Sequence, residues 1–225
     1  MAELRIFSDL DVGAGLEGLR RKRLNFAPEK GAEYIESTGW RIDHYREPLP
    51  AEHPGPPASG GSWEVARRLA TVYEFVDSKL VRAYYDPQEP LESRNMLLEV
   101  HFWGMRIYAG VRSGGVTDGI RREDGSEARV WSWSYRTLEG HFEMGQIDYQ
   151  VWKWLDSGKV EFQIRALSRP APIDDLVVRL GFLLFGRRKQ KEFARRACER
   201  MRKLTRAELG AAPGSSAAPT KLGPH

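Results

Sequence analysis

Between Leu80 and Pro170 the apolar residues recur with a period of two, and clusters of turn residues interrupt them. This pattern is typical of an antiparallel sheet that has one covered face and one face toward water. About five or six strands are predicted, separated by turns at DPQEP, RSGGVTDG, REDGSEA, EGHFEMG and LDSGK. In the fourth strand, alternation places Trp131, Trp133 and Tyr135 on one face and Ser132, Ser134 and Arg136 on the other.

Helical periodicity flanks this region on both sides. Ser62 can cap a helix in which Ala66, Leu69, Tyr73 and Val76 fall on one apolar stripe. The segment 173–209 begins with two acidic residues and becomes steadily more basic, which matches the polarity of a helix. A single helix of about 35 residues would be roughly 50 Å long, so a kink or break is expected near Gly186.

The order helix, antiparallel strands, long helix predicts an α+β fold with the last helix packed on the covered face. The predicted organisation is an irregular N-terminal extension (1–38), a single domain (39–208) and a disordered tail (209–225). Small residues and prolines dominate the tail, which cannot bury enough surface to offset the entropy of ordering. Within the domain, GWRIDHYRE from Gly39 predicts a strand, and the stretch from Glu47 to Gly61, with its many prolines, predicts a long loop.

Composition excludes several classes of protein. The 35 basic and 31 acidic residues are mixed along most of the chain, which argues against a nucleic-acid partner. Cys198 is the only cysteine, so neither an internal disulfide nor a thiolate metal cluster is expected, and a reducing compartment fits best. The acidic N-terminus is unlike a secretion signal, and no apolar run reaches the roughly 20 residues of a membrane span. We therefore expect a cytoplasmic protein without a cofactor.

Two motifs carry a family resemblance. RTLEGHFEMG (136–145) and VEFQIRALSRPA (160–171) resemble the family described as domain of unknown function 1990, whose members have a Thr-Leu-x-Gly-His turn and a strand ending in Ser-Lys/Arg-Pro. This chain departs from the pattern at Gln146, where the family usually has a Glu, so any chemistry that used this acid is in doubt here. The matching residues are Thr137, Leu138, Gly140, His141, Ser168, Arg169 and Pro170.

The resemblance runs from about Leu24 to Leu204 and implies a START-like helix-grip fold. In that fold, which is similar to that of the lipid-transfer and birch-pollen-allergen superfamily, a curved antiparallel sheet grips a long C-terminal helix around a cavity. Because a fold hosts many functions, the resemblance does not fix one.

The first functional hypothesis is a binder of a hydrophobic small molecule or lipid in that cavity. Trp131, Trp133 and Tyr135 would line it, with Arg136 and His141 near its rim, because rings with polar edges suit apolar ligands that need a few hydrogen bonds. The alternative is that these rings only fill the space between the sheet and the helix.

The second hypothesis is an enzyme that uses the same cavity, with His141 as acid or base and Glu143, or Glu139, orienting it. A polar residue beside a glycine in a hairpin is more simply a turn residue. His101 is expected to be structural. The histidines lack ligand spacing, so no metal site is predicted. Gly114, Gly115 and Gly119 lack a following Lys-Ser/Thr, so they predict a hairpin turn and not a phosphate-binding loop.

The third hypothesis is a peripheral protein on an anionic membrane surface. The apolar segment 176–185 followed by basic residues suits an interfacial helix. The simpler interpretation is a solvated basic face, because Phe193, Ala197, Met201 and Leu204 already provide an inward stripe. The sequence leaves the oligomeric state open. The candidate membrane contacts are Arg187, Arg188, Lys189 and Lys191.

Overall fold

A computed structural model describes residues 11–102, 105–172 and 176–211, with residues 102, 105 and 176–186 described by their backbone alone. The elements in chain order are α1 (Val12–Arg20), η1 (Pro28–Glu33), η2 (Glu36–Thr38), β1 (Arg41–Leu49), α2 (Ser62–Thr71), β2 (Val81–Tyr84), β3 (Asn95–Phe102), β4 (Met105–Glu123), β5 (Ser126–Thr137), β6 (Glu143–Trp154), β7 (Val160–Pro170) and α3 (Leu176–Ala211).

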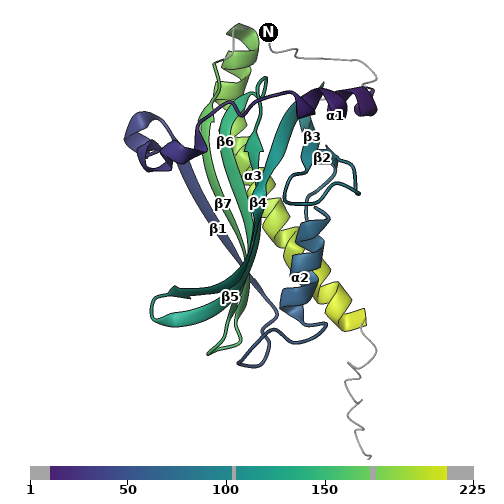
Figure 1. Ribbon diagram of the computed structural model, residues 1–225, viewed down its shortest axis with the longest axis vertical. Coiled ribbons are helices and arrows are strands. Elements are labelled where there is room, and N and C mark those ends of the chain that lie inside the picture. The colour runs from purple at the N-terminus through teal and green to yellow at the C-terminus, as the bar shows by residue number, and fades with distance from the viewer. Residues whose placement is uncertain (1–10, 103–104, 173–175, 212–225) are drawn as a thin grey trace, which may run out of the picture.

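Within the described residues, seven strands form one antiparallel sheet in the order β1-β7-β6-β5-β4-β3-β2. The sheet is curved, and α2 and α3 lie side by side against its concave face (Figure 1). We call this the gripping face and the opposite one the outer face. The predicted α+β fold, a curved antiparallel sheet gripping a long C-terminal helix, is thereby confirmed.

Strand β4 continues through the segment predicted to be a turn. Gly114, Gly115 and Gly119 lie inside it, and the register shifts between Ser113 and Gly115, so this part of the glycine-rich stretch is a β-bulge. The hairpin turn comes later, at Asp124 and Gly125, both of which have positive φ. The prediction of a turn at SGGVTDG was wrong because glycine also marks bulges.

The long β4–β5 hairpin bends away from the helices (Figure 1). Near its tip, the Arg46 guanidinium of β1 donates to Glu123 Oε1 over 3.1 Å, and the Arg121 guanidinium lies 5.9 Å from the ring centre of Trp152. The hairpin therefore reaches over the outer face, and polar side chains there are buried instead of facing water as predicted. These buried residues are Ser132, Ser134, Gln150 and Gln163.

Helix α3 is unbroken from Leu176 to Ala211, so the predicted break near Gly186 is wrong. A helix of 36 residues is about 54 Å long. It crosses the whole gripping face and extends past the end of the sheet, which is why its length exceeds the expected domain width (Figure 1). The helix also includes residues 209–211 of the predicted tail, and 212–225 lie outside the described residues.

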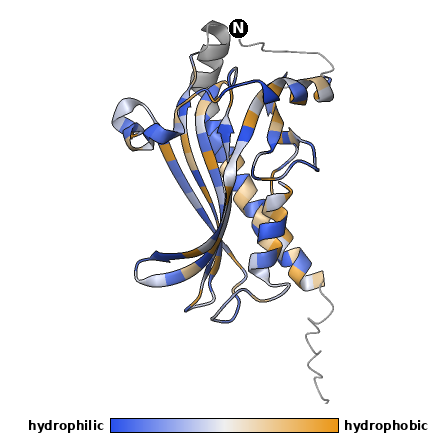
Figure 2. Ribbon diagram, in the orientation of Figure 1, coloured by the Kyte–Doolittle hydropathy of each residue, from blue (hydrophilic) through white to orange (hydrophobic). Residues whose placement is uncertain are grey.

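The main core lies between the gripping face and the two helices. Along the strands, apolar and polar residues alternate (Figure 2), so each strand turns its apolar side chains toward one layer. From α2 come Ala66, Leu69 and Ala70, and from α3 come Ala197 and Met201, all of them buried against the sheet.

The N-terminal extension packs on the domain. Leu19 of α1 is buried with Leu97 and Leu138, and Leu24 forms an isolated antiparallel bridge with Leu138. The extension therefore pairs with and packs against the β5–β6 turn, which carries the family motif.

The start of α2 is capped from a distance. The cap position is Gly61, and the Ser62 hydroxyl, predicted as the cap, is buried with no partner among the described residues. Instead, Glu52 Oε1 accepts the N–H of Trp63 over 2.8 Å, and Glu52 Oε2 lies 2.6 Å from Lys153 Nζ. This buried pair joins the predicted loop, α2 and β6.

Candidate functional site

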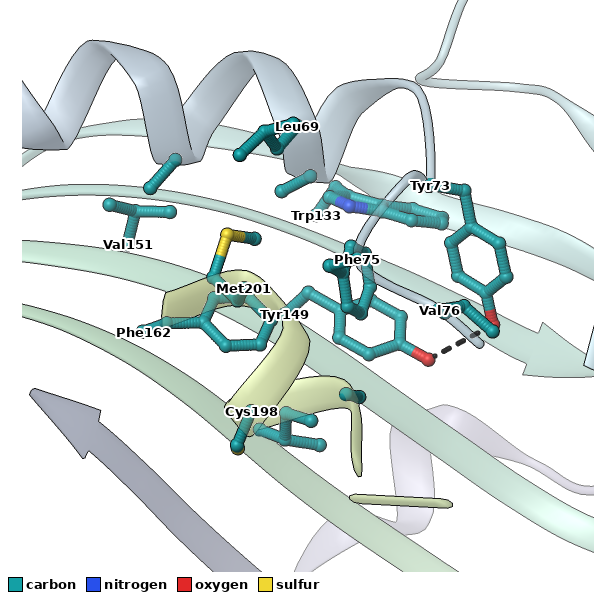
Figure 3. Close-up of a cluster of buried hydrophobic side chains, with 14 of the residues drawn as sticks. Leu69, Tyr73, Phe75, Val76, Trp133, Tyr149, Val151, Phe162, Cys198 and Met201 are labelled. Atoms are coloured by element: carbon teal, nitrogen blue, oxygen red, sulfur yellow. Dashed lines mark hydrogen bonds between the residues drawn. The ribbon is translucent and has the colours of Figure 1, made fainter. Parts of the chain in front are cut away.

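The central row of the gripping face is a filled aromatic core. Trp133, Tyr149, Ile164 and Tyr45 are cross-strand neighbours on β5, β6, β7 and β1. The first three are at most 1% exposed. Phe162 of β7 extends this layer, and Phe75, Cys198 and Met201 close over it (Figure 3). Little space for a ligand therefore remains beneath the second half of α3.

Three tyrosine hydroxyls meet at one edge of this core. The Tyr73 and Tyr149 oxygens are 3.2 Å apart (Figure 3), and the Tyr135 phenol is close enough to interact electrostatically with both. Burial raises the pKa of all three phenols, so they stay protonated at neutral pH and can donate. Elsewhere in the same core, the buried Trp133 Nε1 has no hydrogen-bond partner within the described chain. Buried polar groups concentrated in an apolar layer are typical of a binding site.

The next row toward the start of α3 is more open. It consists of Tyr135, Ile147, Ala166 and Asp43, all of them only half-buried although they face the helix. Phe193 of α3 packs against the same core and is also half-buried. Burial thus decreases along the gripping face from the central row toward the first half of α3.

Charged groups lie beyond this open row. Burial raises the pKa of Glu143 to about 6, while a hydrogen bond from Gln190 of α3 and the charges of Arg41 and Arg187 oppose that rise. Arg187 forms an ion pair with Asp43. Glu143 and the three tyrosines form a polar edge along the apolar row. The negative charge of Glu143 helps to raise the pKa of the Tyr135 phenol.

His141 lies in the β5–β6 turn and is buried. Its Nδ1 accepts the backbone N–H of Glu143 over 2.9 Å, and the backbone N–H of His141 donates to the Leu138 carbonyl over 3.0 Å. Burial lowers its pKa to about 3, so the ring is neutral at pH 7 and only a weak base. These contacts are those of a turn residue.

Arg136 lies on the outer face and not beside Tyr135. Its Nε donates to Gln146 Oε1 over 2.8 Å, and Gln146 Nε2 donates to Asp148 Oδ1 over 2.8 Å. Gln146, the departure from the family pattern, therefore bridges an arginine and a half-buried carboxylate away from the gripping face. The structure does not bring Arg136 together with the aromatic candidates.

Trp131 has different surroundings from Trp133. It lines a groove of about 560 Å³ between α2, the loop at Leu91, β4 and β5. Trp131, Trp133 and Tyr135 thus occupy three settings along one strand, which are the groove, the filled core and the open row.

Several motif residues of the family hold the turn together. Thr137 Oγ1 accepts the N–H of Gly145 over 2.8 Å and donates to Asn25 Oδ1 over 2.6 Å, and Asn25 Nδ2 donates to the Glu143 carbonyl over 2.8 Å. Gly145 has φ +150°, and a Cβ there would be 1.9 Å from the Leu167 carbonyl oxygen. This network positions Glu143 at the end of the open row.

The candidate membrane contacts are partly neutralised. Arg187 pairs with Asp43 and Lys189 with Glu192, while Arg188 and Lys191 are exposed without an ion pair in the described chain. The side chains of the apolar segment 176–185 lie outside the described residues. No helix in the described ranges is long and apolar enough to cross a membrane.

His101 bonds to Glu99 Oε1 over 2.5 Å and to the Lys79 carbonyl over 3.2 Å. Among the residues described here, no group of three or more His, Cys, Asp or Glu side chains is arranged to hold a metal ion.

The topology and the gripping-face site define an α+β helix-grip domain. Residues 27–200 match the family described as Domain of unknown function (DUF1990), and the chain belongs to that family. No match was found among curated protein sequences.

Comparison with solved structures finds distant similarity. The Thermus thermophilus protein TTHA0849 is 7% identical, with a TM-score of 0.46 over 76% of this chain and 99% of its own. For Ara h 8.0201 the identity is 9% and the TM-score 0.40, over 75% and 99% of the two chains. Human STARD10 is 9% identical, with a TM-score of 0.31 over 94% and 88%. These values carry no functional assignment.

Sequence reasoning did not find Tyr73, Tyr149 or Gln190 as parts of the site. Tyr149 had a usable signal, because the alternation of β6 places it on one face with Ile147 and Val151. Gln190 had none, since its role depends on how α3 is rotated against the sheet.

Proposed function

We propose that this protein binds a hydrophobic small molecule or lipid between the gripping face and the first half of α3. The observation that carries the proposal is the half-buried row of Tyr135, Ile147 and Ala166, which lies next to buried hydroxyls. A ligand with an apolar body would cover this row and remove its surface from water.

The polar groups at the edge of the open row would fix the orientation of the ligand. The Tyr135 hydroxyl can donate to an acceptor on the ligand, and protonated Glu143 can donate as well below its pKa of about 6. Because unpaired buried donors cost free energy, a ligand carrying an oxygen at this end is favoured over a pure hydrocarbon.

The experiment is a fluorescence titration with N-phenyl-1-naphthylamine, an uncharged apolar dye. Ile147→Trp places a large ring in the open row and is expected to weaken dye binding by about tenfold or more, because overfilled apolar space excludes a ligand. Ala166→Met is a milder change in the same row and is expected to act in the same direction.

Ile42→Trp is the matched control, because Ile42 is 56% exposed on the outer face of β1. It is expected to leave dye affinity unchanged. Thermal unfolding of each variant establishes that it is folded. Folded Ile147→Trp and Ala166→Met proteins that bind the dye as tightly as the original chain would refute the proposal.

A further inference from the structure

The groove beside α2 is separate from the gripping-face site. Its volume of about 560 Å³ is within the usual range for small-molecule pockets. Trp131 and Leu91 are buried at its base, and Val65 and Val116 are half-buried. The floor is therefore apolar.

The Arg67 side chain lines this groove, and its guanidinium N–H groups form no hydrogen bond within the described chain. Its guanidinium is 5.3 Å from the ring centre of Trp63 and 3.7 Å from Asp118, too far for a hydrogen bond to that carboxylate. Arg67 and Asp118 form only a long ion pair, and Asp118 is bound more closely by Arg129, over 2.7 Å. Arg67 is 44% exposed and donates no side-chain hydrogen bond to the described part of the chain.

Two of the other charged residues that line the groove already have partners. Arg68 pairs with Glu208, and Glu64 Oε2 accepts the N–H of Gly60 over 2.9 Å. Glu92 is exposed at the rim and has no ion pair among the described residues. Trp131, which also lines the groove, donates no indole hydrogen bond to the described chain.

We propose that this groove binds an amphiphile whose apolar body lies on Trp131, Leu91 and Val116 and whose carboxylate pairs with Arg67. Guanidinium binds carboxylate through two parallel N–H donors, and the neighbouring Trp63 ring holds the guanidinium in place. The acidic Glu92 opposes the ligand's charge at the rim. The site is independent of the function proposed above.

The test uses dodecanoate below its micelle range, with dodecanol as the uncharged match, and follows the indole N–H signals by NMR. The Trp131 signal, assigned from Trp131→Phe, is expected to shift on titration with dodecanoate. Arg67→Gln is expected to weaken dodecanoate binding about fivefold to tenfold, because a charge-assisted bond is lost. Glu92→Gln is expected to strengthen it, and neither substitution should alter the response to dodecanol.

Arg122→Gln is the control, because Arg122 is 71% exposed at the hairpin tip and pairs with Glu127 away from the groove. An unshifted Trp131 signal overturns the proposal, and so does a dodecanoate affinity that Arg67→Gln leaves unchanged in a folded protein. A shift of the Trp133 signal alone places the ligand on the gripping face; that result overturns the groove site and leaves the function proposed above standing.

Discussion

The hydroxyl oxygens of Tyr73 and Tyr149 lie 3.2 Å apart inside the core, although one belongs to the segment after α2 and the other to β6. Tyr149→Phe leaves the Tyr73 hydroxyl with fewer partners and is expected to lower the free energy of unfolding by about 1 to 2 kcal/mol. Urea denaturation measures the change.

A double-mutant cycle isolates this pair. Because each hydroxyl serves the other, Tyr73→Phe with Tyr149→Phe is expected to cost less than the two single changes together. Strictly additive costs would show that the hydroxyls do not interact.

Glu143 is expected to make stability fall with rising pH. Its pKa is about 6 in the folded chain against 4.5 ordinarily, so between these values the folded state holds a proton that unfolding releases. Its contribution is greatest below pH 4.5 and falls by about 2 kcal/mol in total as the pH rises through 6 toward 7. Glu143→Gln should remove this slope and stabilise the protein at pH 7, as measured by urea denaturation at several pH values. An identical slope in the variant would contradict this explanation.

Gly145→Ala is expected to destabilise the domain severely. The new Cβ would clash with the Leu167 carbonyl oxygen at 1.9 Å, in a backbone conformation at φ +150° that side chains rarely adopt. We expect a loss of more than about 3 kcal/mol, or failure to fold. Gly119→Ala, where nothing lies within 4 Å, is the control and should be nearly neutral. Similar melting temperatures for the two variants would show that the close approach at Gly145 is not required.

The buried ion pair between Lys153 and Glu52 is expected to stabilise the junction between the loop and α2. Both side chains are at most 5% exposed, so Lys153→Met leaves a buried carboxylate without its cation. The expected cost is about 3 to 5 kcal/mol in chemical denaturation. Adding Glu52→Gln should recover part of it, because the uncompensated charge is removed. No recovery would mean that Glu52 acts mainly as the cap of Trp63.

Much of the fold follows from local patterns. The period-two segments, the strand at Gly39 and the presence of two flanking helices were predictable because alternation and helical spacing are properties of a few neighbouring residues. The predicted inclusion of Tyr73 and Val76 in the first helix was wrong, because α2 ends at Thr71 and Tyr73 has positive φ. The continuity of β4 through Gly115 was not, since a glycine pair marks a bulge and a turn equally well. The continuity of α3 through Gly186 depends on a helix extending past the sheet, which no local pattern encodes.

The site was less predictable than the fold. Trp131, Trp133 and Tyr135 share a face as predicted, yet the helices above them give each a different environment. The same alternation places Arg136 on the opposite face, so its predicted position at the rim of the cavity conflicted with the strand pattern. The cap from Glu52 and the hydrogen bond from Gln190 to Glu143 join residues far apart in sequence, so only tertiary packing reveals them.

The most direct test of ligand binding on the gripping face is NMR of the chain with labelled isoleucine and valine methyl groups in the presence of N-phenyl-1-naphthylamine. We predict intermolecular nuclear Overhauser contacts between the dye rings and the Ile147 methyl groups, and none to Ile42. Contacts confined to Val65 and Val116 of the groove, or to Ile42, with none at Ile147, would contradict it.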